Sequence, residues 1–190
     1  MRRKLTNTTR AILVFGVVAS LSGCMLTLTL GGGPWQAFTM GNVLIEWCDG
    51  AVCLYCPRGR TCIDMVNPAS DGGTIQEWQI YVSGPETIKL KIFRDDGAGQ
   101  YVFVGESALE SAVAGMNTFE CSIPGVQAGD YVGFYVVGTG TATVRAKAGG
   151  GLPYAHIGDV IEGTSIGEWF PASGITGQFS IYAIGCGAAP

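Results

Sequence analysis

The sequence predicts an all-β protein, a single antiparallel β-sandwich with a short Cys-rich segment on its N-terminal side. Runs of β-branched, aromatic and alternating residues recur at roughly 8–12-residue spacing between turns that contain Gly or Pro. The chain has 30 glycines among 190 residues, 47% hydrophobic residues and 14% charged residues. This composition supplies enough apolar side chains for one core and excludes intrinsic disorder.

The clearest predicted strand covers 87–94. Its leucine and isoleucines alternate with threonine and lysine, and this period of two predicts one buried and one solvated face. We therefore expect Leu90 in the core and both Lys89 and Lys91 in solvent. By similar criteria the other expected strands are 43–47, 51–55, 61–66, 74–82, 101–105, 117–123, 131–137, 141–147 and 178–184.

Turn residues separate these strands, with tight turns predicted at 49–50, 83–85 and 95–97. Only 107–114 has a helical composition, and it forms either a short helix or a connecting loop. The chain is therefore divided into a signal or anchor segment at 1–23, a linker at 24–41, a Cys-rich β segment at 42–66 and the β-sandwich domain at 67–190.

Basic residues at the N-terminus precede an uncharged apolar stretch at 11–21, which runs into Leu21-Ser22-Gly23-Cys24. This order resembles the signal of bacterial lipoproteins, in which cleavage precedes the cysteine and its sulfur takes a diacylglycerol. The resemblance implies lipidation at Cys24 and an extracytoplasmic, membrane-anchored protein at the outer membrane or cell surface. The uncharged stretch 11–30 leaves an uncleaved N-terminal membrane helix open, and ordinary secretion is a third alternative.

The charge balance disfavours anionic partners. The full chain has 11 basic and 15 acidic residues, a net charge of −4. Residues 1–23 hold four of the basic residues and no acidic one, so their removal leaves a net charge of −8. A chain of this charge is not expected to bind nucleic acid, whereas neutral sugars or a basic protein surface remain suitable partners.

The seven cysteines are an odd number, which requires an explanation in an exported protein. If Cys24 is lipidated, six remain for disulfides in an oxidising compartment. The disulfide candidates are Cys48, Cys53, Cys56, Cys62, Cys121 and Cys186, and their pairing stays open. Two alternatives use the first four of them: a four-thiolate zinc site, or a redox pair formed by Cys53 and Cys56.

Several short motifs between residues 67 and 137 resemble jelly-roll units of bacterial and phage surface proteins. They are Asn67-Pro68-Ala69, 71–75 (DGGTI), 115–119 (GMNTF) and 126–133 (VQAGDYVG). Gly129-Asp130 before an apolar strand is also similar to tumour necrosis factor-like and carbohydrate-binding jelly rolls. The resemblance covers less than half of the chain and implies a jelly-roll-like sandwich. It carries no binding residues, because sandwiches host many functions.

The sequence offers one weak hydrolase signature. The run 163–167 (GTSIG) matches G-x-S-x-G, and Ser165 could join His156, the only histidine, and Asp159 in a triad. The motif works at a strand-to-helix turn, which an all-β region rich in glycine does not provide. We therefore predict no catalytic residue and no enzyme, and keep a hydrolase as the second alternative.

No cofactor and no metal ligand are assigned from the sequence. Asp95-Asp96-Gly97 offers oxygen atoms to Ca²⁺, but the alternating ligands and distal Glu of an EF-hand are missing. We interpret these residues as a hairpin turn. Calcium therefore remains an unsupported alternative.

Three aromatic residues, Tyr154, Trp169 and Phe170, lie in or near Gly-rich segments and are the candidate ligand-contact residues. Aromatic ring faces stack on the apolar faces of sugars, and a few polar groups orient the ligand. The expected function is a non-catalytic surface binding or adhesion module, for glycans or for a surface protein. The alternative is a structural subunit of a filament, coat or envelope complex, which would be a homo-oligomer built through strand edges.

Overall fold

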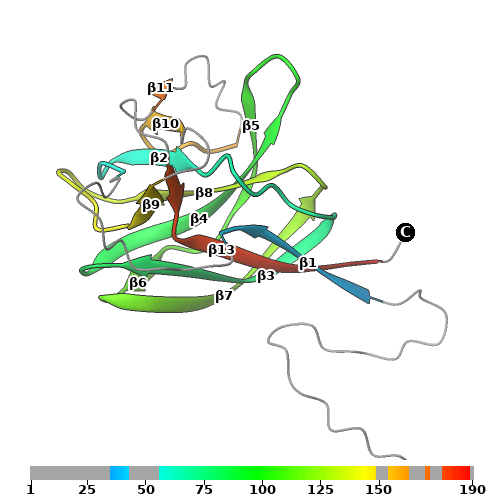
Figure 1. Ribbon diagram of the computed structural model, residues 1–190, viewed down its shortest axis with the longest axis horizontal. Helices are drawn as coiled ribbons and strands as arrows, with labels where there is room; N and C mark the ends of the chain where they lie inside the picture. Colours follow the sequence, from blue (N-terminus) through cyan, green and yellow to red (C-terminus); the bar gives the residue numbers. More distant parts are fainter. Residues whose placement is uncertain (1–34, 43–55, 149–153, 163–169, 172–176, 189–190) are drawn as a thin grey trace, which may run out of the picture.

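The computed structural model describes residues 35–42, 56–148, 154–162, 170–171 and 177–188. These residues form strands and loops and contain no helix. Among them there is accordingly no helix that is long and apolar enough to cross a membrane. Two antiparallel sheets pack together, and Figure 1 shows the strands β1, β13, β3 and β7 as the lower layer. The predicted all-β sandwich is confirmed.

The smaller sheet has four strands in the order β1-β13-β3-β7. They are β1 (Trp35–Gly41), β13 (Ile181–Ala188), β3 (Gly73–Val82) and β7 (Gly115–Val126). The larger sheet has the order β11-β10-β2-β8-β4-β5, and β6 also pairs with β4. Its strands are β11 (Phe170–Pro171), β10 (Tyr154–Ile157), β2 (Arg60–Ile63), β8 (Tyr131–Val136), β4 (Glu86–Asp95), β5 (Tyr101–Glu106) and β6 (Glu110–Ala112). A separate pair joins β9 (Ala146–Ala148) to β12 (Gly177–Phe179).

The connectivity is that of a jelly roll. Eight strands make up its framework, namely β1, β2, β3, β4, β5, β7, β8 and β13. Numbered by their order along the chain, the first, eighth, third and sixth are neighbours in the smaller sheet. The second, seventh, fourth and fifth are neighbours in the larger one. Chain segments thus alternate between the layers as two Greek keys, the jelly-roll pattern that the sequence motifs imply.

Aromatic and branched side chains fill the space between the sheets. Trp78 of β3 is fully buried, and its ring centroid lies 4.8 Å from that of Phe119 on the neighbouring strand. Phe134 and Phe179 meet edge to face with centroids 4.8 Å apart. Aromatic pairs in such geometry add to the free energy gained by burying their area. Leu90 of β4 is also fully buried, as its position in the alternating pattern predicts.

A second, smaller cluster covers the opposite face of the larger sheet. Ile63, Phe93, Tyr101 and Val160 are buried there together. Val160 follows β10. Its backbone amide donates a hydrogen bond to Thr61 Oγ1 of β2 at 3.2 Å, which holds this segment against the sheet. The prediction that this face is solvated is therefore wrong over part of its area, because residues 158–160 lie across it.

The boundaries of several predicted elements need correction. Residues 35–41, which the sequence assigns to a linker, form β1 and pair with β13. Part of 107–114, interpreted as a helix or loop, forms the short strand β6. In the expected strand 141–147, only the C-terminal part belongs to a strand, β9. The expected strands 43–47 and 51–55 lie outside the described residues.

A partly buried ion pair fixes the turn between β7 and β8. Gly129 has a φ of 93°, a conformation that favours glycine. This places Asp130, whose side chain is 1% exposed, against Arg94 of β4, with both carboxylate oxygens 2.7 Å from guanidinium nitrogens. Asp130 Oδ2 also accepts a hydrogen bond from the Gln127 amide at 2.8 Å. The Gly-Asp motif is therefore a structural clamp between β4 and the hairpin.

Candidate functional site

A polar hollow lies where the end of β1 meets the loop after β2. It has a volume of about 430 Å³, which is within the range of small-ligand sites. The lining residues within the described ranges are all uncharged. They are Thr39, Met40, Gly41, Asn42, Asn67, Pro68, Ser70 and Gln178.

Backbone hydrogen bonds build this hollow from three segments that are distant in sequence. The Gly41 amide donates to the Asn67 carbonyl at 2.7 Å, and the Ser70 amide donates to the Thr39 carbonyl at 3.1 Å. The Asn42 amide donates to the carbonyl of Ile181 in β13 at 2.7 Å. The 67–70 loop is thereby held against β1, which a flexible linker could not provide.

A buried carboxylate fixes the segment that contributes Gln178 to the hollow. Asp64, only 1% exposed, accepts hydrogen bonds from the Val66 amide at 2.9 Å and the Phe179 amide at 2.8 Å. The second bond fixes the chain directly beside Gln178. Burial raises the pKa of Asp64 to about 6, although its two hydrogen bonds to backbone amides act in the opposite direction.

Two amide side chains in the hollow remain available to a ligand. Asn67 is exposed and Gln178 is partly exposed. Neither side-chain amide makes a hydrogen bond to another described residue. Each amide offers both a donor and an acceptor, while Pro68 contributes an exposed apolar surface. The arrangement can bind a neutral, hydroxyl-rich molecule.

Two of the predicted aromatic contact residues lie in the strands at the β11 edge of the larger sheet. Tyr154 is in β10 and Phe170 is in β11, and the register pairs Tyr154 with Pro171 and Ala155 with Phe170. The structure thus brings these two backbone positions together at the sheet edge. Trp169 lies outside the described residues.

The hydrolase hypothesis receives no geometric support from the described residues. Ser165 lies outside them. His156 is in β10, opposite Thr61 of β2. Asp159 forms ion pairs with Lys89 and Lys91 and does not orient a histidine in any described contact.

A cluster of two lysines and two carboxylates lies on the outer face of β4. Lys89 Nζ is 3.0 Å from Glu106 and 2.8 Å from Asp159, and Lys91 Nζ contacts the same two carboxylates. Lys91 is completely buried, so its predicted solvent exposure is wrong. Burial acts to raise the pKa of Asp159, but the hydrogen bond from Lys89 and the charges of both lysines hold it below its ordinary value.

The cysteines follow the disulfide prediction only in part. Cys56 and Cys62 form a disulfide and both are fully buried. This bond excludes the four-thiolate zinc site and the pairing of Cys56 with Cys53. Cys186 is also disulfide-bonded. Cys24, Cys48 and Cys53 lie outside the described residues.

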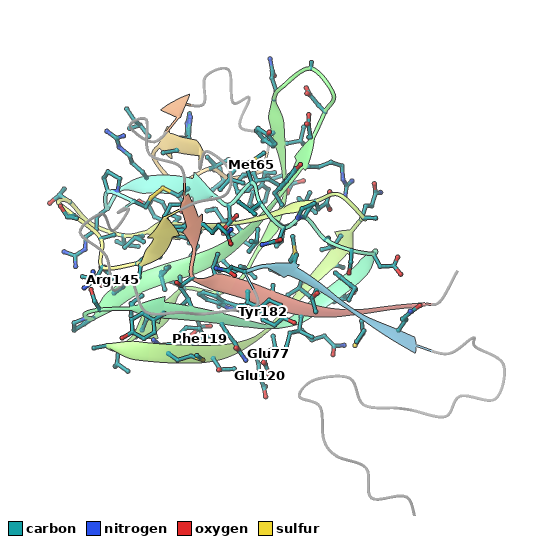
Figure 2. All side chains as sticks on the ribbon, viewed as in Figure 1. Met65, Glu77, Phe119, Glu120, Arg145 and Tyr182 are labelled. Atoms are coloured by element: carbon teal, nitrogen blue, oxygen red, sulfur yellow. A yellow bond between two sulfur atoms is a disulfide. The ribbon has the colours of Figure 1, made fainter. Side chains whose placement is uncertain are left out.

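Cys121 corrects the disulfide prediction, because it is a free thiol. It lies half-buried on β7, where the neighbouring position Glu120 pairs with Glu77 of β3. Figure 2 shows Glu77 and Glu120 at the smaller sheet. Burial, followed by the charges of Glu110 and Glu77, raises the pKa of the Cys121 thiol to about 11. A cysteine in an edge strand can thus stay reduced without being reactive.

We expect Cys121 to resist alkylation in the folded protein. Its pKa lies about two units above the ordinary value of 9.0, so its thiolate fraction falls about 100-fold at neutral pH. Iodoacetamide labelling, followed by peptide mass spectrometry, measures this directly. The unfolded protein is the control and should label at the rate of an ordinary thiol. Equal rates in both states would refute the expectation.

A second hollow, of about 400 Å³, lies beside an ion pair between the partly exposed Arg58 and the buried Glu86. Glu86 Oε2 is 2.9 Å from Arg58 Nε, and its other oxygen accepts a hydrogen bond from the Thr143 amide. Hydrogen bonding to Glu86 raises the pKa of Arg58. Because the carboxylate is used internally, this ion pair ties the loop before β2 to β4.

No group of three or more His, Cys, Asp or Glu side chains in the described part of the chain could hold a metal ion. Asp95 and Asp96 instead accept hydrogen bonds within their turn, from the amides of Gly97 and Ala98 at 2.8 Å each. Comparison with known proteins yields no matching family model, curated protein or solved structure.

Proposed function

We propose that the protein is a membrane-anchored, extracytoplasmic binding module that recognises neutral glycans without catalysis. The observation that carries this proposal is the hollow between β1 and the 67–70 loop, in which no charged side chain is found among the described lining residues. Its amide and hydroxyl groups match the hydrogen-bonding groups of a sugar. Its volume of about 430 Å³ accommodates a small saccharide.

The chemistry of the hollow favours sugars over charged ligands. Asn67 and Gln178 can each donate and accept hydrogen bonds, as vicinal hydroxyls require. Pro68 provides an apolar surface for the C–H face of a ring. An anion would find no cationic side chain among the lining residues that the structure describes, and the acidic chain would repel it.

The proposed anchor is the lipid on Cys24, with an uncleaved N-terminal helix as its alternative. Lipid-anchored copies at the outer membrane or cell surface would present many hollows to one surface. Weak individual sites then gain avidity, because each further contact forms at a high effective concentration. Adhesion can therefore result from a small site with modest affinity.

Binding of the full chain in detergent to an array of neutral and acidic glycans tests this function. We expect signal on neutral glycans, and we expect Asn67→Ala combined with Gln178→Ala to reduce the affinity about 5- to 150-fold, because two hydrogen bonds of about 0.5–1.5 kcal/mol each are lost. The matched control is Gln100→Ala, an exposed amide in the β4–β5 turn. Absence of signal for the wild type, or equal signal for the double variant, would refute the proposal.

A structural subunit is the second candidate, because β7 ends the smaller sheet and exposes one long edge. Edge strands can pair with another chain. Pro124 and the charged Glu120 lie within β7, however, and both residue types limit such pairing. The array measurement is therefore made on the monomeric fraction from size-exclusion chromatography. Glycan binding by the monomer supports the binding module over the subunit.

A further inference from the structure

Lys91 occupies an unusual position for a lysine. Its side chain has no exposed surface, and its Nζ lies 5.1 Å from the centre of the Phe103 ring. Nζ donates to the Val160 carbonyl at 2.6 Å and contacts a Glu106 oxygen. Burying an ammonium ion costs several kcal/mol even when it is paired. The environment therefore favours any reaction that removes this charge.

Asp159 presents its carboxyl group directly to this amine. Its Oδ1 lies 2.6 Å from Lys91 Nζ. That oxygen is buried and has no hydrogen-bond partner, so the close contact does not have hydrogen-bond geometry. Asp159 Oδ2, by contrast, accepts a hydrogen bond from Lys89 at 2.8 Å. The amine and the carboxyl group are thus held in contact before any reaction.

We propose that Lys91 and Asp159 form an intramolecular amide (isopeptide) bond, with Glu106 carrying the proton between them. This modification joins β4 to the segment that follows β10. It goes beyond the proposed function, since it needs no ligand.

The reaction balances without an external reagent. Glu106 accepts a proton from the Lys91 ammonium group, and the freed nitrogen lone pair attacks Cγ of Asp159. The nitrogen–carbon bond forms, a carbon–oxygen bond breaks, and the departing oxygen leaves as water with the protons released by nitrogen. One ammonium and one carboxylate become a neutral amide and one water, and Glu106 returns to its starting state. Its contact with Nζ suits a general acid–base group.

The charges of the cluster remain balanced after the reaction. Before it, Lys89 and Lys91 face Glu106 and Asp159, two cations against two anions. Afterwards Lys89 still pairs with Glu106 at 3.0 Å. The carboxyl side chains of Glu106 and Asp159 are 28% and 29% exposed, which gives the released water a route to solvent. The buried ion pair that is most costly to maintain is the one removed.

Mass spectrometry of the purified full chain tests the proposal. After reduction and proteolysis we expect a branched peptide that joins the Lys91 segment to the Asp159 segment, lighter by one water than the two peptides together. Trypsin should fail to cut after Lys91. Recovery of only the two separate, unmodified peptides would overturn the proposal, and this result needs no variant to fold.

Variants assign the roles. Lys91→Arg and Asp159→Ala should each abolish the branched peptide. Glu106→Gln keeps both reacting groups and should lower the cross-linked fraction at least 10-fold, as expected when a general base is removed. Lys89→Ala is the matched control, because Lys89 contacts the same carboxylates, and it should retain the bond. A cross-link at Lys89 instead, or an unchanged fraction in Glu106→Gln, would contradict the assignment.

Discussion

Replacing Lys91 by alanine is expected to lower the free energy of unfolding by about 3–5 kcal/mol. The substitution removes a fully buried cation and leaves Glu106 and Asp159 to share Lys89. It also deletes the hydrogen bond that holds the Val160 carbonyl at 2.6 Å. Urea unfolding followed by tryptophan fluorescence measures the loss. The covalent bond proposed above would increase it, because a cross-link restricts the unfolded chain.

Lys89→Ala is the matched control for this measurement. Lys89 pairs with the same carboxylates, but its side chain is 17% exposed and its charge is partly solvated. We expect a loss of about 1 kcal/mol, near the upper range for solvent-exposed pairs. If both substitutions cost the same free energy of unfolding, the burial of Lys91 has no energetic role in the cluster of two lysines and two carboxylates.

Asp64 is expected to make the fold more stable as the medium becomes mildly acidic. Its pKa is about 6 in the folded protein, above its ordinary value of 3.8, so the folded state binds the proton more tightly. Its ionised form therefore destabilises the fold at neutral pH, and this penalty decreases progressively as the pH falls from about 6 towards the unfolded-state value of 3.8. The difference of about two pKa units amounts to about 3 kcal/mol in full, of which about 2 kcal/mol is recovered between pH 7 and pH 4.

Asp64→Asn isolates this effect from other titrating groups. Asparagine cannot ionise, so the stability of the wild type relative to the variant should rise by about 2 kcal/mol over that pH range. Denaturant unfolding at several pH values supplies both curves. Opposing trends, such as the acid-sensitive ion pairs of Asp159, cancel in the difference. Parallel pH profiles for the two proteins would show that Asp64 titrates normally.

Local sequence patterns predict most of the sandwich. The alternation in β4 places Leu90 in the core, and Ser83, Gly84 and Pro85 mark the turn before it, because both signals depend only on neighbouring residues. Local patterns do not predict β1, because its residues follow a Gly-rich stretch and its strand conformation depends on pairing with β13. Long-range pairing partners are not encoded in local periodicity.

The sites are less predictable because distant segments assemble them. The alternating pattern of β4 puts Lys91 on the face that is expected to be solvated. Its side chain is buried because Asp159 and Val160, which are distant in sequence, lie over it. The hollow combines β1, the 67–70 loop and Gln178. Asn67-Pro68 is recognisable as a motif, but nothing in the sequence indicates which residues it faces. Of the three predicted aromatic contacts, Tyr154 and Phe170 belong to β10 and β11 of the larger sheet.

A crystal structure of the protein with the strongest neutral glycan from the array tests the central claim most directly. The account predicts a sugar ring in the hollow between β1 and the 67–70 loop, with hydroxyl groups hydrogen-bonded to Asn67 and Gln178 and an apolar face against Pro68. A glycan bound instead at the β10–β11 edge, beside Tyr154 and Phe170, would contradict it.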